Sequence, residues 1–166
     1  MAQTLMELLR EKPLSSISIT EITKKAGVSR MTFYRNYNSI EEIFGKYNDY
    51  IFRCYHEEVL AHGKHASFIQ KDNILIAFEF FRRYAEYITC LMNNNLGGCI
   101  REKIIENELS LSLSSKNNDE SRYLTIAYAN TIFGILTAWL QGGMKEKPEM
   151  LADLICNLYQ DKLRRF

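Results

Sequence analysis

The chain has 166 residues, of which 46% are hydrophobic and 25% are charged, and 21 basic side chains against 20 acidic ones leave a formal net charge of +1. These ordinary globular values exclude intrinsic disorder, a collagen-like repeat and a small disulfide-stabilised scaffold, and the length fits one domain or two small ones. The balanced charge excludes a protein that coats nucleic acid over its whole surface, but it is compatible with a basic patch on one face.

The first predicted element is a helix over residues 2–12, where leucines recur at helical spacing on one face. Pro13 ends this helix, because proline has no backbone N–H and restricts the residue before it. Ile17 and Ile19 alternate with polar residues. We expect an extended connector here, with both isoleucines packed inward.

Two short helices follow, joined by a glycine-containing turn. Thr20 is expected to cap a helix over residues 21–26, and Gly27 suits the left-handed conformation that closes a helix. Ser29 is expected to cap a second short helix over residues 30–36. Two short helices with apolar anchors and this turn are typical of a helix-turn-helix.

The remaining two thirds of the chain also predict helices and no sheet. A capping box at residues 39–42 opens a long helix to about residue 62. Residues 63–72 are predicted to be a loop, and residues 110–121 a serine-rich linker. Further helices are predicted over residues 73–92, over residues 100–109, from residue 123 to a stop at Gly142 and Gly143, and over residues 148–163.

Residues 123–144 contain no charged side chain, which is the crude signature of a membrane span. Thr125, Asn130, Thr137 and Gln141 interrupt the stretch, and no block of basic residues flanks it. We therefore expect a helix of a water-soluble protein, buried on two faces. In so short a chain, we expect the second cover to be a partner subunit.

The second short helix carries the side chains that favour DNA binding. Phe33 and Tyr37 are four residues apart and share the inward face, which directs Arg30, Met31 and Arg35 toward the other faces. Arginine can grip guanine edges, and threonine or methionine can touch a thymine methyl group. Between residues 20 and 37, four basic residues face one acidic residue, a net charge of +3. A plain helical hairpin with solvated arginines remains the alternative on this pattern alone.

Residues 18–37, Ser-Ile-Thr-Glu-Ile-Thr-Lys-Lys-Ala-Gly-Val-Ser-Arg-Met-Thr-Phe-Tyr-Arg-Asn-Tyr, resemble the DNA-binding region of the TetR family of bacterial transcriptional regulators. The resemblance covers about residues 2–50. It implies that Thr20 contacts a phosphate, that Tyr34 grips the backbone and that further contacts come from the turn and the second short helix. The implied DNA-binding residues are Thr20, Ser29, Arg30, Met31, Thr32, Tyr34, Arg35 and Asn36.

Two departures from the family pattern affect these expectations. Ile40 stands where the family usually has a lysine that holds a phosphate, which puts that contact in doubt. The family often carries a basic arm before the first helix, and this sequence begins almost at that helix. Minor-groove contacts from an arm are therefore not expected of residues 1–166.

The resemblance implies an all-α fold in two parts. Residues 1–45 would form a three-helix helix-turn-helix DNA-binding domain, and residues 46–166 a helical effector-binding and dimerisation domain. The last two helices would form the dimer, and apolar residues upstream would line an effector pocket or pack as core. The interface candidates are Tyr128, Ile132, Leu136, Trp139, Leu151, Leu154, Ile155 and Leu158, and the pocket candidates are Phe78, Phe81, Tyr84 and Cys90.

The function expected from this resemblance is a cytoplasmic repressor that binds a palindromic operator as a homodimer and is released by an effector, a small apolar molecule. The alternative is an activator or co-regulator that a protein partner signals. The end of the chain resembles regulators of dihydroxyacetone kinase operons, where a partner protein carries the signal. No catalytic residues, metal site or cofactor are expected, since nucleophile, phosphate-binding and metal-ligand motifs do not occur.

Overall fold

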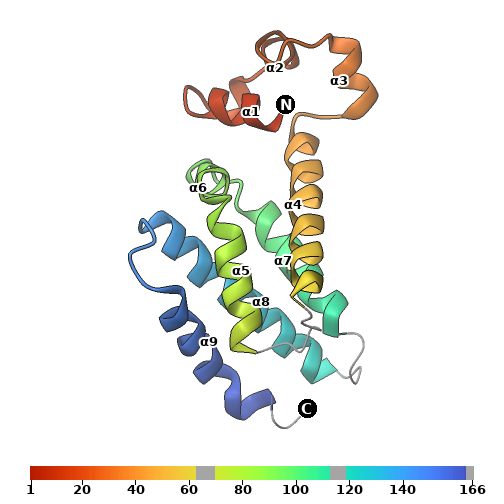
Figure 1. Ribbon diagram of the computed structural model, residues 1–166. Helices are drawn as coiled ribbons and strands as arrows, with labels where there is room; N and C mark the ends of the chain where they lie inside the picture. Colours follow the sequence, from red (N-terminus) through yellow and green to blue (C-terminus); the bar gives the residue numbers. More distant parts are fainter. Residues whose placement is uncertain (63–69, 113–118, 164–166) are drawn as a thin grey trace.

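The structure is a computed structural model that describes residues 1–62, 70–112 and 119–163, and Figure 1 shows its arrangement. In these ranges the chain forms nine α-helices and no strand, which confirms the all-α prediction. Helices α1–α3 form a small head, α5–α9 form a larger body, and α4 joins the two. The helices are α1 (Ala2–Leu9), α2 (Ile19–Lys25), α3 (Arg30–Asn36), α4 (Glu41–Ala61), α5 (Lys71–Arg82), α6 (Ala85–Asn93), α7 (Gly98–Ser112), α8 (Asp119–Gln141) and α9 (Pro148–Leu163), with a 3-10 turn at Leu14–Ser16.

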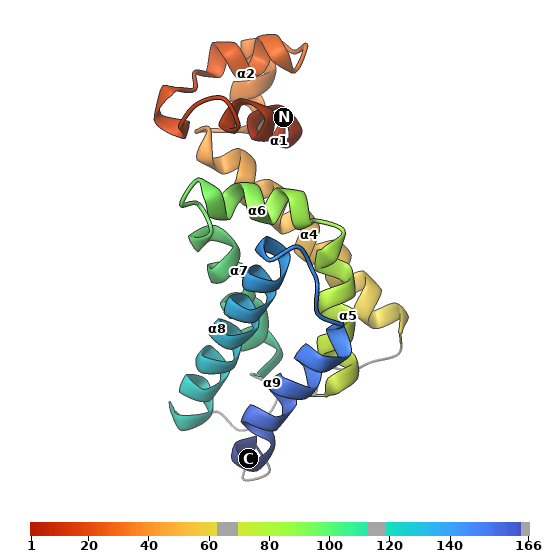
Figure 2. The ribbon, with the colours of Figure 1, turned by 90° about the vertical axis from the view of Figure 1, so that its left-hand side faces the viewer.

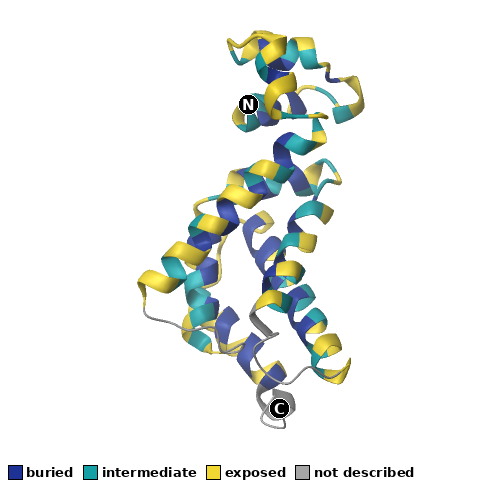
Figure 3. Ribbon diagram, turned by 90° about the vertical axis from the view of Figure 1, so that its right-hand side faces the viewer, coloured by how far each residue is buried: buried dark blue, intermediate teal, exposed yellow. Residues whose placement is uncertain are grey.

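The head has its own small apolar core. Leu5 of α1, Ile22 of α2 and Phe33 of α3 are completely buried. Each lies on the apolar side of an amphipathic helix, and in Figure 3 buried and exposed positions alternate along these helices. The three helices therefore hold one another in place through side chains that the sequence pattern already assigned to the interior.

Helix α4 continues from the head into the body. Its buried residues Ile43, Phe44, Ile51, Phe52 and Tyr55 recur at helical spacing, so one apolar stripe runs along its length. The upper end of the stripe lies beneath the head, and the lower end packs in the body (Figure 1). The expected domain boundary after residue 45 thus falls within a continuous helix.

The body is held together largely by contacts on one side of α8. Helix α8 packs against α6, α7 and α9, and α5 packs against α9 (Figure 2). Aromatic rings join these helices: the ring centroids of Phe78 in α5 and Trp139 in α8 are 5.3 Å apart, and those of Tyr128 in α8 and Tyr159 in α9 are 5.4 Å apart. These edge-on and tilted contacts bury the largest apolar side chains between the helices.

The prediction of one helix over residues 73–92 is wrong, because the chain breaks into α5 and α6 at Arg83 and Tyr84. The backbone N–H groups of these two residues donate three residues back, to Phe80 and Phe81, which ends α5 in a tight turn. The break redirects α6 so that it contacts both α1 and α8. Burial of Tyr87, Ile88 and Leu91 in this new direction outweighs continuation of the first helix.

The start of α2 also differs from the prediction. Its N-cap is Ser18 and not Thr20: the Ser18 hydroxyl accepts from the Glu21 backbone N–H at 3.2 Å, and the Glu21 carboxylate accepts from the Ser18 N–H at 3.0 Å. This reciprocal pair satisfies two backbone donors, which a cap at Thr20 cannot do. The expected connector is extended only at residues 17 and 18, because a 3-10 turn precedes them.

Other predicted boundaries also need correction, and α1 ends at Leu9 rather than at residue 12. The Ser39 hydroxyl accepts from the Glu42 N–H at 3.3 Å as expected, but the Glu42 carboxylate accepts from the Asn38 N–H, so the box is not reciprocal at Ser39. Within the predicted linker, residues 110–112 continue α7 and residues 119–121 begin α8. Residues 113–118, like residues 63–69 of the predicted loop, lie outside the described ranges.

Helix α8 is long and apolar enough to cross a membrane by length and composition alone. One side of the helix packs inside the body, with Tyr128, Ala129 and Leu136 at most 5% exposed, and 44% of the apolar stretch is buried. The helix ends as predicted, because Gly143 has a φ of +84° and the Met144 N–H donates to the Trp139 carbonyl at 2.9 Å. A core helix of a helical domain meets the same test of length and composition.

Candidate nucleic-acid interface

The candidate interface is built on α3, which two local features position. Gly27 has a φ of +68°, a left-handed conformation that other residues adopt at an energetic penalty, and the following N–H of Val28 donates to the Thr23 carbonyl at 3.0 Å. Ser29 then caps α3, since its hydroxyl accepts from the Thr32 N–H at 3.0 Å. The turn and the cap together fix where α3 begins.

One aromatic side chain fixes the rotation of α3 about its axis. Phe33 is completely buried, and its ring centroid lies 5.5 Å from those of both Tyr34 and Tyr37. Because Phe33 faces the head core, the other faces of the helix point outward. Met31 is 76% exposed and Tyr34 is 59% exposed, values that are unusual for large apolar or aromatic side chains.

The predicted DNA-contact residues fall into two groups. Thr20, Arg30, Met31, Tyr34 and Arg35 are exposed. Three others are engaged within the head: the Ser29 and Thr32 hydroxyl oxygens are 3.0 Å apart, and the Asn36 side-chain amide donates to the Thr32 carbonyl at 2.7 Å. The second group supports α3 through these contacts, and two of its members, Ser29 and Asn36, are exposed as well.

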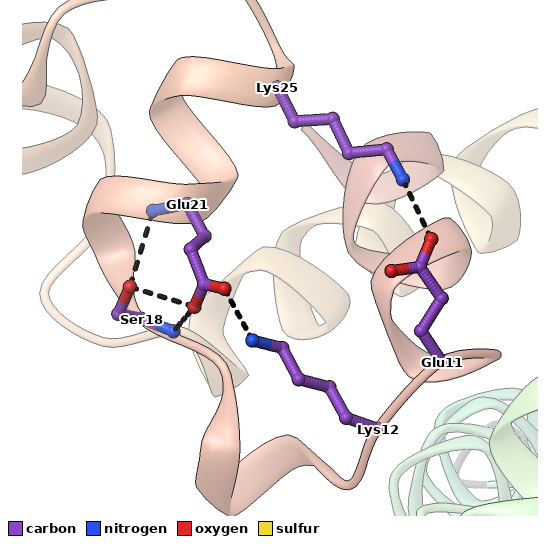
Figure 4. A network of polar contacts seen from close by, with 5 residues as sticks. All are labelled: Glu11, Lys12, Ser18, Glu21 and Lys25. Atoms are coloured by element: carbon purple, nitrogen blue, oxygen red, sulfur yellow. Dashed lines mark hydrogen bonds and ion pairs between the residues drawn. The ribbon is translucent and has the colours of Figure 1, made fainter.

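Ion pairs within the head redistribute its charge, as Figure 4 shows. Lys12 pairs with Glu21, and the Lys25 ammonium lies 3.4 Å from Glu11 and 3.5 Å from Glu7. The Lys12 ammonium, helped by the Ser18 hydrogen bonds, lowers the pKa of Glu21 to about 2. These pairs join α2 to α1 and to the turn that follows α1, and they neutralise Lys12 and Lys25.

Lys24, Arg30 and Arg35 are exposed and form no ion pair with the described residues. Lys24 was counted in the charge of the sequence segment but was not among the predicted contact residues. Lys24 is unpaired because its neighbour Lys25 is the lysine that faces the acidic residues of α1 and the turn after it. Which of the two lysines does so depends on the angle at which α2 packs against α1, and the sequence does not specify that angle. The unpaired positive charge of the head is thus concentrated on α2 and α3, as phosphate binding requires.

The predicted interface residues of the last two helices also divide. Tyr128, Ile132, Leu136, Trp139, Leu151 and Ile155 are at most 7% exposed within a single protomer. Only Leu154 and Leu158 reach solvent, with 46% and 54% of their surface exposed. Met150, which was not predicted, is 51% exposed and lies four residues before Leu154 on the same helix face.

The predicted effector-pocket residues are mainly packed against other rings. Phe78 contacts Trp139, and Phe81 contacts Phe52 at a ring-centroid distance of 5.4 Å. Cys90 is buried, which raises the pKa of its thiol, and Tyr84 is half-buried. An open pocket of about 320 Å³ lies between α1 and the start of α4, lined by Met1, Ala2, Gln3, Tyr37, Ile43, Lys46 and Tyr47. Across the described residues, no three metal-ligating side chains gather to hold an ion.

Comparison with known proteins matches both parts of the chain. Residues 3–47 match the family described as bacterial regulatory proteins, tetR family, and residues 70–161 match the family described as transcriptional regulator C-terminal region. The second match alone spans more than half of the chain. The search of curated proteins finds no match. The two matched segments correspond to the head and to the body.

Proposed function

Because the chain belongs to the TetR family of bacterial transcriptional regulators, we propose that this DNA-binding regulator is a cytoplasmic repressor that binds a palindromic operator as a homodimer. The observation that carries the proposal is the outward display of Arg30, Met31, Tyr34 and Arg35 on a helix anchored by Phe33. A major groove accepts such a helix, and arginine reads guanine there. Binding of two equivalent half-sites would place the recognition helices about 34–36 Å apart or a multiple of that distance.

Selection of bound DNA from a random pool tests this proposal. We expect the wild-type protein to enrich an inverted repeat at a stated, fixed salt concentration, because affinity for phosphate depends steeply on salt. Arg30→Ala should weaken binding to that repeat by about 1–3 kcal/mol if Arg30 grips a guanine, and Tyr34→Phe should weaken it through loss of a phosphate contact. Normal binding by both variants would contradict the assignment of α3 as the recognition helix.

The proposed dimer uses the solvent-facing sides of α8 and α9. On α9, Met150, Leu154 and Leu158 form an exposed apolar row at four-residue spacing. On α8, Ala127, Gly134 and Ala138 are exposed and small, which permits close approach of a second helix. These two rows form what we call the α8–α9 face. The six buried candidates would then support this face from behind.

A second candidate function concerns the source of the signal. The proposed repressor is released by a small apolar effector, which would have to separate the rings around Phe78 and Phe81. Their close packing favours the alternative, in which a protein partner acts on the body and the chain is an activator or co-regulator. Purified protein on operator DNA distinguishes the two: an effector screen that releases the DNA supports the first, and a response only to an added protein fraction containing the partner supports the second.

A further inference from the structure

The first two turns of α4 hold the end of the recognition helix. The Lys46 ammonium donates a hydrogen bond to the backbone carbonyl of Asn36, the last residue of α3. The same nitrogen lies 5.3 Å from the centroid of the Tyr37 ring and 3.3 Å from a carboxylate oxygen of Glu42. One side chain of α4 thus contacts two consecutive residues at the end of α3.

Glu42 completes this arrangement from the same face of α4. Its carboxylate accepts from the backbone N–H of Asn38 at 2.6 Å and from the Asn38 side-chain amide at 3.0 Å. The Asn38 backbone hydrogen bond, followed by the Lys46 contact, lowers the pKa of Glu42, so the carboxylate stays ionised. Lys46 and Glu42 together hold residues 36–38, the end of α3 and the first two residues of its junction with α4.

Such a junction matters because α3 has only seven residues. A helix this short is unstable alone, since its terminal carbonyl groups lack partners within the helix and nucleation is unfavourable. A cation at the C-terminal end supplies both a hydrogen bond and a favourable interaction with the helix dipole. Ser29 caps the N-terminal end of α3, Phe33 anchors its middle in the head core, and Lys46 of α4 binds the carbonyl at its C-terminal end.

We propose that Lys46 is a positioning residue for operator binding, which holds the end of α3 on α4 and leaves the phosphates to other cations. The proposal rests on the operator binding proposed above. Ile40, which stands in the position of the family's phosphate-holding lysine, is half-buried against the core. Lys46 is the first basic residue of α4, and its ammonium donates to the Asn36 carbonyl within the protein.

Salt dependence distinguishes positioning from phosphate contact. If Lys46 only positions α3, Lys46→Met lowers the fraction of free protein in which α3 is held in the conformation that binds DNA. The apparent affinity for DNA then falls in proportion to this fraction. The contacts in the complex are then unchanged, so the slope of log K against log salt stays the same. A phosphate contact would instead reduce the slope by about 0.9.

The experiment measures operator binding by fluorescence anisotropy at several salt concentrations, with the DNA selected by the wild type. We expect Lys46→Met to weaken binding about fivefold with the wild-type slope, as the loss of one hydrogen bond of ordinary net strength implies. Lys46→Arg, which keeps the donor and the charge, should restore binding to within about twofold. The matched control is Lys71→Met, which removes an exposed ion pair with Asp153 in the body and should bind like the wild type.

Three results would overturn the proposal: a reduced salt slope in Lys46→Met, unchanged affinity in that variant, or no rescue by arginine. Hydrogen exchange in the free protein tests the same contact without DNA. The amides of Asn36 and Tyr37 should exchange several-fold faster in Lys46→Met than in Lys71→Met, and equal rates would contradict the role. Failure of the wild type to select DNA would count against operator binding alone, because the exchange experiment still decides the role of Lys46.

Discussion

At the residue scale, the start of α2 shows how a local hydrogen-bond pattern selects between two neighbouring side chains. Ser18 and Thr20 are both good capping residues by type. Only Ser18 has Glu21 three residues after it, and the structure forms the reciprocal box at that pair. Thr20 is left exposed on the outer surface of the head, which keeps it available for the phosphate contact that the family resemblance implies.

We expect Ser18→Ala to lower the free energy of unfolding by about 1 kcal/mol, because the first turn of α2 loses its cap. Thr20→Ala should change it by less than about 0.5 kcal/mol, as exposed substitutions away from special features do. Urea denaturation of both variants beside the wild type measures the difference. If Thr20→Ala lowered the free energy of unfolding more than Ser18→Ala, Thr20 and not Ser18 would be the N-cap of α2.

Glu21 makes the stability of the head depend on pH. Its pKa is lowered to about 2 by Lys12 and Ser18. A carboxyl group with a depressed pKa stabilises the fold above its unfolded pKa of about 4.3, and this contribution is lost as the pH falls through the folded pKa. Glu21→Gln should therefore lose less stability than the wild type between pH 5 and pH 2.

Denaturation at a series of pH values measures this effect as the difference between wild type and variant. The matched control is Glu57→Gln, at an exposed position of α4. Its pH profile should follow the wild type. Parallel profiles for the wild type and Glu21→Gln would contradict the role given to the Lys12–Glu21 pair.

At the element scale, the break between α5 and α6 creates the contacts that join the body to the head. Redirected α6 places Glu86 against Arg10 at the end of α1, and the two side chains form an ion pair. It also places Tyr87 in the interior, where its hydroxyl donates to the Asn48 side-chain oxygen of α4 at 2.7 Å. Burial raises the pKa of Tyr87, so the phenol remains a donor at neutral pH.

Tyr87→Phe should destabilise the protein by about 1–3 kcal/mol, because it leaves the buried Asn48 oxygen without this donor. Tyr34→Phe removes a hydroxyl of the same kind from an exposed ring and should leave stability unchanged. Thermal and urea unfolding of both variants provide the comparison. Equal stability of the two would show that the α4–α6 hydrogen bond contributes nothing.

Elements of the fold were predictable from the sequence where local signals coincide. The Gly27 turn, the Ser29 cap and the inward Phe33 follow from residue type and spacing, and so does the end of α8 at Gly143. The break at Arg83 and Tyr84 was not predictable, because neither glycine nor proline stands there and the break is stabilised by distant partners. The unpaired state of Lys24 and the junction role of Lys46 likewise depend on helix packing, which sequence spacing does not specify.

At the scale of the whole molecule, the α8–α9 face sets the expected assembly. Its exposed row of Met150, Leu154 and Leu158 is larger than single scattered apolar residues, and such rows mark contact surfaces. Two copies joined through this face would carry two heads. Operator recognition would then depend on the distance and orientation between the two heads and not only on the surface of one head.

Introducing charge into this face tests the assembly. Leu154→Glu combined with Leu158→Glu should convert the protein to a monomer at micromolar concentration and should abolish cooperative binding to the inverted repeat. Leu60→Glu, at a leucine of α4 that is 65% exposed outside the face, is the matched control and should keep the wild-type mass. Sedimentation equilibrium measures the masses. A monomeric wild type, or a dimeric double variant, would contradict the proposed face.

The uninterrupted course of α4 gives the molecule a lever arm. Its 21 residues, at 1.5 Å per residue, extend about 30 Å from the body to the head. A tilt of about 10° at the body end therefore displaces the head by about 5 Å, more than the 3.4 Å rise of one base pair. In a dimer, the displacements of the two heads would add. A small repacking among the body helices would then be enough to move the two recognition helices out of register with successive turns of the major groove.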